Sequence, residues 1–174
     1  MENSIQYRSL GTPYASRVIG LILPIQQIEF NVPIDIDAQP DLLDIQHYYH
    51  GAGGGFWGAF HGEELVGTIG LIPFGGGEAA IRKMFVKKEY RGATHGVATR
   101  LLQLAIDHCR ETGIGAVYLG TVEILQAAQR FYEKNGFDRI DPANLPPSFP
   151  RMPVDTLFYH LAIESPRITA TFEK

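Results

Sequence analysis

Apolar side chains recur at two spacings along the chain, and these spacings predict where helices and strands lie. Near the N-terminus, five of them follow helical spacing: Val18, Leu21, Ile22, Ile25 and Ile28. Pro24 should kink or divide this helix, because proline cannot donate the backbone hydrogen bond. Residues 56–60 and 65–72 are strand-like apolar runs, and the short polar stretch between them predicts an antiparallel hairpin.

The remaining segments alternate between strand-like and helix-like patterns. Strands are expected at residues 5–10, 79–86, 116–119, 137–140 and 154–162, and helices beginning near residues 40 and 97 and at 127–134. Gly113 is placed to end the helix that begins near residue 97. A helical N-terminal part is thus followed by a hairpin, a strand–helix–strand–helix unit and two final strands. This order predicts a mixed sheet in an α/β or α+β domain.

Length, composition and charge narrow the class of protein. The 174 residues suit one domain, residues 1–174, and the 45% hydrophobic content is that of an ordinary globular protein. A net charge of −4 argues against a nucleic-acid partner. Cys109 is the only cysteine, so no internal disulfide can form, and its place on an apolar helix stripe predicts a buried core residue. The first residues lack signal-peptide features and the apolar run at 18–25 is too short to span a bilayer, so we expect a cytoplasmic protein without a membrane partner.

The stretch from residue 84 to residue 98 carries the clearest chemical signal. An apolar strand-like run ends there, a basic and glycine-punctuated loop follows, and the chain passes directly into an amphipathic helix. The backbone N–H groups of a first helical turn lack partners within the helix, and the helix dipole favours an anion there. The pattern therefore predicts a phosphate-binding loop.

Three segments, in this order, resemble the GNAT superfamily of acetyl-CoA-dependent N-acetyltransferases. They are Arg82-Lys83-Met84-Phe85-Val86, then Glu89-Tyr90-Arg91-Gly92 leading to Gly96-Val97-Ala98, then Ala128 with Phe131-Tyr132-Glu133-Lys134-Asn135-Gly136-Phe137. The resemblance implies a mixed, mostly antiparallel sheet of about six to seven strands, flanked by about four helices. It also implies that the sheet is splayed between two parallel strands.

The chain departs from the family pattern at two places. Counted forward from Arg91, Thr94 occupies the position of the first loop glycine; counted back from the helix, Ala93 stands where Arg or Gln belongs. The economical interpretation is a slightly longer loop that still wraps a diphosphate. Leu125 stands where the family often has an Asn that binds the pantetheine arm.

The resemblance implies a set of cosubstrate contacts. The backbone of Met84, Phe85 and Val86 would pair with the pantetheine arm of acetyl-CoA, and a backbone N–H near Met84 or Phe85 could stabilise the oxyanion. The diphosphate would be held by Arg91 and by the loop and first helical turn: Gly92, Ala93, Thr94, His95, Gly96, Val97 and Ala98. Ala128 and Tyr132 complete the set, and Tyr132 matches the position that commonly protonates the leaving thiolate.

The general base is not fixed by the sequence. Many relatives carry Glu at the position of Ala80, and Glu78 shares its parity on the strand, so Glu78 is one candidate. Glu29 and His50 are others, and a water relay is an open alternative. No metal is expected, because His47 and His50 have only Asp44 near them on one helix face.

The resemblance implies transfer of an acetyl group to a primary amine of a small molecule or protein, by direct attack in a ternary complex. Acids and aromatics in the acceptor region would suit a cationic amine, and Glu29, Tyr49 and Trp57 are the candidates. A non-catalytic acyl-CoA sensor on the same fold is the alternative. A nucleotide-binding enzyme ranks last, because the chain lacks both the P-loop and the dinucleotide-binding motif. A homodimer is common in such families, and the sequence leaves it open.

Overall fold

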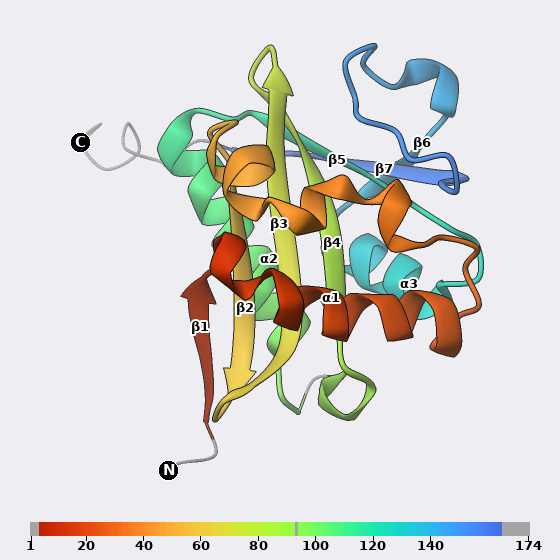
Figure 1. Ribbon diagram of the computed structural model, residues 1–174. Coiled ribbons are helices and arrows are strands. Elements are labelled where there is room, and N and C mark those ends of the chain that lie inside the picture. The colour runs from red at the N-terminus through yellow and green to blue at the C-terminus, as the bar shows by residue number, and fades with distance from the viewer. Residues whose placement is uncertain (1–3, 93, 165–174) are drawn as a thin grey trace.

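The computed structural model describes residues 4–92 and 94–164, which form a seven-stranded sheet between layers of helices (Figure 1). The strands lie in the order β1-β2-β3-β4-β5-β7-β6, and neighbours are antiparallel except for β4 and β5. Their bounds are β1 Ile5–Ser9, β2 Gly55–His61, β3 Glu64–Gly75, β4 Glu78–Val86, β5 Ala116–Thr121, β6 Asp138–Ile140 and β7 Leu157–Ala162. The predicted mixed and mostly antiparallel sheet is confirmed.

Helices cover both faces of the sheet. One face carries α1 (Ala15–Pro24), which continues as a π-helical turn η2 (Ile25–Glu29), and the short turns between residues 36 and 50 (Figure 1). The other face carries α2 (Val97–Thr112) and α3 (Gln126–Lys134), whose apolar residues share one core with the strands. In the described ranges, no helix has both the length and the apolar character that a membrane crossing needs.

Local sequence signals explain most of these boundaries. Pro24 is the last residue of α1, and the widened turn that follows confirms the predicted division of the helix. Gly113 ends α2 in the left-handed conformation, as its position predicts. Cys109 is fully buried, and burial raises the pKa of its thiol to about 12. After Pro40 the chain forms only the short 3-10 turn η4 (Pro40–Leu43) instead of a longer helix.

The last strand begins later than its apolar pattern predicts. It starts at Leu157 rather than at residue 154, because the backbone turns before it. The N–H of Asp155 donates to the carbonyl of Met152 at 3.1 Å, and the N–H of Thr156 donates to Thr121 at 2.9 Å. Asp155 therefore lies in a turn beside the end of β5.

The sheet opens between its two parallel strands. β4 and β5 pair over only three positions, from Glu78 to Ala80 on β4, and then diverge. A bulge lies just beyond: the register with β3 shifts, so that Lys83 and Met84 together oppose Ile69. Lys83 has a φ of +54°, which is rare for a residue with a side chain. The buried hydroxyl of Thr68 donates to the Lys83 carbonyl at 2.8 Å and so supports the bulge.

Replacing Thr68 by Val should weaken the fold at this bulge. The substitution keeps the shape but leaves the buried Lys83 carbonyl without its hydroxyl donor, so we expect the free energy of unfolding to fall by about 1–3 kcal/mol. Urea denaturation would measure this. Thr112→Val is the matched control, because the Thr112 hydroxyl makes the same kind of bond to His108 at 2.8 Å but on the surface. It should change the free energy by no more than about 0.5 kcal/mol, and equal losses in the two variants would contradict the assignment.

Candidate functional site at the opening of the sheet

A small cavity of about 90 Å³ lies on the α1 side of the opening between β4 and β5. Its walls come from η2 and the segment at residues 32–34 that follows it, from β4, from Gly120 of β5 and from the loop that precedes β7. Most of the lining is apolar, and the polar members are Gln26, Arg82, Lys83 and Asp155. Charged groups in a mostly apolar concave site are typical of a binding or catalytic centre.

Lys83 belongs to a buried charge cluster behind this cavity. Its ammonium lies 3.6 Å from the carboxylate of Asp41, and the two side chains are only 4% and 7% exposed. Burial lowers the pKa of Lys83 to about 8, although the Asp41 charge opposes the shift. The hydroxyl of Tyr49 donates to the same carboxylate at 2.5 Å, and burial together with Asp41 raises the pKa of Tyr49. The cluster therefore ties the bulge to the short helical turns above it.

Asp155 faces the opening from the opposite wall. Its carboxylate accepts a hydrogen bond from the N–H of Met152 at 3.3 Å and lies directly over Gly120. A Cβ at residue 120 would lie 2.4 Å from Asp155 Oδ2, so only glycine allows this approach. Burial raises the pKa of Asp155 to about 6, against the pull of the positive charges of Arg82, Lys83 and Arg151.

Tyr132 approaches the opening from α3, on the other face of the sheet. Its side chain is buried against the rings of Phe137 and Tyr159, and its hydroxyl donates to the thioether of Met84 at 3.8 Å. Burial raises the pKa of Tyr132, and the negative charge of Asp155 adds to the shift. The phenol is therefore protonated at neutral pH and points at the bulge.

The predicted phosphate loop follows β4. After η6 (Lys88–Tyr90) the chain enters α2 through Gly96, which has a φ of +63° and precedes the first helical residue, Val97. The N-cap residue is this glycine, so among the described residues the N-cap position offers no side-chain cap to α2. The side chains of Val97 and Ala98 pack into the core, so the helix presents backbone amides. Thr94 and His95 are exposed, and Ala93 lies outside the described residues.

The side chain of Arg91 ties the loop to the N-terminal helix. Its guanidinium forms two hydrogen bonds with the carboxylate of Glu29, at 2.5 and 2.7 Å, and Nε donates to the carbonyl of Val86 at 2.7 Å. The hydrogen bond from Arg91 lowers the pKa of Glu29. Two of the predicted acceptor-binding residues therefore have different surroundings. Glu29 is paired with Arg91, whereas Tyr49 is buried and bonded to Asp41.

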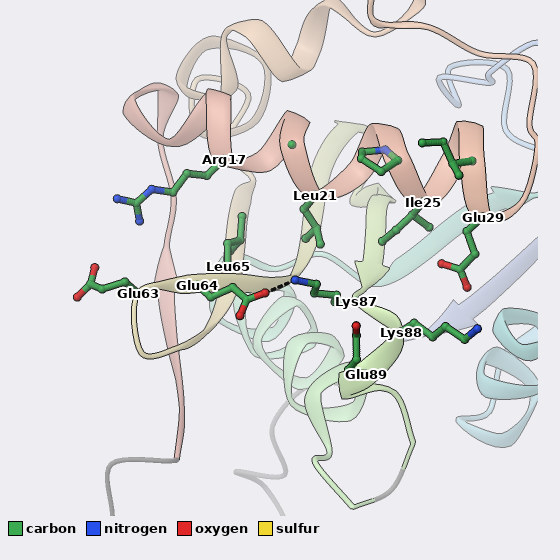
Figure 2. Close-up of a pocket in the computed structure, with 13 residues that line it drawn as sticks. Arg17, Leu21, Ile25, Glu29, Glu63, Glu64, Leu65, Lys87, Lys88 and Glu89 are labelled. Atoms are coloured by element: carbon green, nitrogen blue, oxygen red, sulfur yellow. Dashed lines mark hydrogen bonds and ion pairs between the residues drawn. The ribbon is translucent and has the colours of Figure 1, made fainter.

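A larger groove of about 560 Å³ borders the same region (Figure 2). Leu21 and Ile25 point into it from the N-terminal helix, and Lys87 pairs with Glu64 on the side opposite that helix (Figure 2). Glu29 stands at one end, where its ion pair with Arg91 joins the helix to the loop after β4. This groove and the small cavity at the opening have no lining residue in common.

Two predicted residues lie away from the opening. Trp57 packs on the α2 face of the sheet against His108, with ring centres 5.6 Å apart, so the structure does not bring it together with Tyr49. Glu78 lies at the closed end of β4 and accepts a hydrogen bond from Tyr118 at 3.1 Å. Five residues of extended strand place it about 16 Å from Lys83.

The sequence assigned no role at the cavity to three charged residues that line it, Arg82, Lys83 and Asp155, although Arg82 and Lys83 belong to the segment that resembles the family. Two adjacent cations inside an otherwise apolar strand were the available signal for Arg82 and Lys83. Among the described residues, no group of three or more His, Cys, Asp or Glu side chains could hold a metal ion. Around the opening the arrangement places a buried protonated phenol (Tyr132), a carboxylate (Asp155) and the N-terminus of α2, which has no side-chain cap at its N-cap residue.

Known proteins resemble this chain in sequence and in fold. The family described as "Acetyltransferase (GNAT) family" matches residues 22–137. The N-acetyltransferase YjgM of Escherichia coli K12 is 34% identical over 109 residues, which make up 61% of this chain and 64% of that protein. A crystal structure of a GNAT-family acetyltransferase from Staphylococcus aureus Mu50 has a TM-score of 0.89 and 41% identity, and the match covers 92% of this chain and 100% of that one.

A further solved structure with the same fold contains a ligand. The PaiA N-acetyltransferase of Thermoplasma acidophilum, whose structure is a complex with coenzyme A, shares the fold with a TM-score of 0.68 at 20% identity and covers 91% of this chain and 99% of that one. The chain spans less than two thirds of the length of the curated relatives it matches first. Because the family match extends over most of the residues, the chain belongs to the acetyltransferase (GNAT) family.

Proposed function

We propose that this protein transfers the acetyl group of acetyl-CoA to a primary amine of a small molecule or protein, by direct attack in a ternary complex. The observation that carries the proposal is the opening between β4 and β5. The N-terminus of α2, which has no side-chain cap at its N-cap residue, lies near the end of the opening where the cosubstrate would bind. A cavity with charged walls lies on the α1 side of the opening. Membership of the acetyltransferase family supports the same conclusion.

The residues present fit acetyl-CoA. Its diphosphate would bind the backbone amides of residues 92–98, where the dipole of α2 favours an anion. Beyond Ala80 the edge of β4 no longer pairs with β5, so the backbone from Met84 to Val86 can pair with the amides of the pantetheine arm. Ala128 lies on α3, half-buried against the same core, and borders this side. Arg91 would act by fixing the loop, because its guanidinium is engaged by Glu29.

The chain can also stabilise charge during transfer. A backbone N–H at Met84 or Phe85, turned by the bulge, would donate to the oxyanion of the tetrahedral intermediate. When the carbon–sulfur bond breaks, the thiolate needs a proton. Tyr132 can supply it, because burial keeps the phenol protonated and its hydroxyl already contacts a sulfur atom on β4.

An acceptor screen tests the proposed function directly. The purified protein would be incubated with acetyl-CoA and a set of amines comprising amino acids, polyamines, aminoglycosides and peptides with free N-termini, and release of free thiol would be followed. Turnover with at least one amine is expected. Tight binding of acetyl-CoA without turnover of any amine would instead favour a sensor.

Replacing Tyr132 by Phe should lower kcat by roughly 100-fold, since a general acid contributes about that much. Acetyl-CoA binding, measured by calorimetry, should change little, because only the hydroxyl is lost. Tyr159→Phe is the matched control: Tyr159 is also buried and its ring contacts Tyr132, but its hydroxyl donates to Glu133. An unchanged kcat across the pH range in the Tyr132 variant would remove its role as the acid.

Replacing Gly96 by Ala should weaken acetyl-CoA binding roughly tenfold, because each 1.4 kcal/mol of strain or lost contact corresponds to that factor. Ala disfavours the φ of +63° that brings the loop into α2, so the amides would shift. Gly62→Ala is the control, since Gly62 has a φ of +64° and equally open surroundings, but lies in the β2–β3 turn. Both variants should lose similar stability. Equal acetyl-CoA affinity in the two would contradict the assigned loop.

A further inference from the structure

Ala80, the last residue of β4 that pairs with β5, belongs to a small apolar cluster with Phe149 and Phe158. Among the described residues that line the cavity at the opening, Asp155 carries the only carboxylate. At Ala80, β4 therefore offers no acidic side chain. The acid comes instead from the loop before β7, across the opening from the bulge.

We propose that Asp155 binds the ammonium group of the acceptor in this cavity and takes its proton before the amine attacks the thioester. The inference rests on the proposed acetyl transfer and names the residue that makes the amine nucleophilic. It replaces Glu78, which lies at the closed end of β4 and bonds to Tyr118.

The surroundings of Asp155 leave its carboxylate able to bind a cation. It accepts a hydrogen bond from the backbone of Met152, and in the described part of the chain no Lys, Arg or His nitrogen lies within 4 Å of it. A carboxylate can accept about four hydrogen bonds, so acceptor capacity remains for an ammonium. The turn at residues 152–155 and the close approach to Gly120 hold the group over the point where the strands part.

The charged and titratable groups that act on this carboxylate come from β4, from its own loop and from α3. Arg82 and Lys83 lie on β4, Arg151 lies on the same loop, and Tyr132 approaches from α3. The positive neighbours favour the ionised form, but burial outweighs them and places the pKa at about 6. A base with this pKa is ionised at neutral pH and still binds a proton well, as efficient proton transfer requires. Asp155 also raises the pKa of Tyr132, so a base and an acid act across one opening.

The proton and electron balance closes without any further reactant. The Asp155 carboxylate takes one proton from R–NH3⁺, and the freed lone pair forms a bond to the thioester carbon. The carbon–sulfur bond of the intermediate then breaks, and the sulfur takes a proton from Tyr132. The nitrogen, still carrying one excess proton, returns it to the tyrosine through water. Asp155 releases its proton to solvent, so R–NH3⁺ and the acetyl thioester give the acetamide, the free thiol and one proton.

The test compares two nucleophiles that differ in protonation. Ethanolamine is an ammonium at neutral pH, whereas hydroxylamine is mostly neutral and needs no base for activation. Asp155→Asn should lower kcat/KM for ethanolamine by about 100-fold or more and for hydroxylamine by only a few fold. In the wild type, kcat/KM for ethanolamine should fall as pH drops through about 6 and level off above it, and this acidic limb should vanish in the variant.

Control variants separate catalysis from folding. Asp155→Glu keeps a carboxylate and should retain the acidic limb with partial activity, and Asp138→Asn, on the exposed surface of β6, should behave as wild type.

Equal losses for the two nucleophiles would show a structural role and overturn the inference. So would a wild-type rate that rises tenfold per pH unit with no plateau, since the enzyme would then be selecting neutral amine from solution. Acetylation of neither nucleophile nor of any screened amine would contradict the proposed function itself, and acetylation that does not depend on Asp155 would contradict only this inference.

Discussion

The opening of the sheet depends on one local distortion, the bulge of β4 at Lys83 and Met84. An undistorted β4 would continue to pair with β5, and the sheet would close over the site. Because Lys83 takes a positive φ, the strand turns and its backbone groups leave the ladder. Thr68 supports the distorted carbonyl from the neighbouring strand. The cavity, the free strand edge and the approach of Tyr132 all follow from this geometry.

The charged groups around the cavity are costly for the fold. The lowered pKa of Lys83 means that burial disfavours its charged form, and the raised pKa of Asp155 means the same for its carboxylate. An isolated buried charge would be strongly destabilising, so Lys83 is held beside Asp41, which also binds Tyr49. Asp155 has no such partner within ion-pair distance among the described residues. A carboxylate left without a close cation at the mouth of a cavity is easier to understand as a functional group than as a structural one.

The sequence predicted the fold well and the site unevenly. The hairpin, α2 with Gly113 and α3 followed from local periodicity and turn chemistry, which depend on neighbours in the chain. The bulge at Lys83 did not, because a strand pattern carries no mark of register shifts. Asp155 was read as part of the last strand, since its flanking apolar residues fit that pattern; the turn that excludes it depends on contacts with β5. The ion pair of Arg91 with Glu29 joins residues far apart in the chain and had no local signal.

The two sides of the opening use different kinds of recognition, and this difference explains why the sequence informs on one side only. In the proposed function, the cosubstrate side works through backbone groups: the amides before and within the start of α2 and the free edge of β4. Such groups require glycines, a helix start and a strand end, which leave spacing patterns that a sequence displays. The proposed acceptor side works through side chains of η2 and the residues after it, of β4 and of the loop before β7, which only the fold brings together. Each of these side chains can change without disturbing the backbone groups on the other side of the opening, so in the proposed function the choice of acceptor can vary while acetyl-CoA stays the donor.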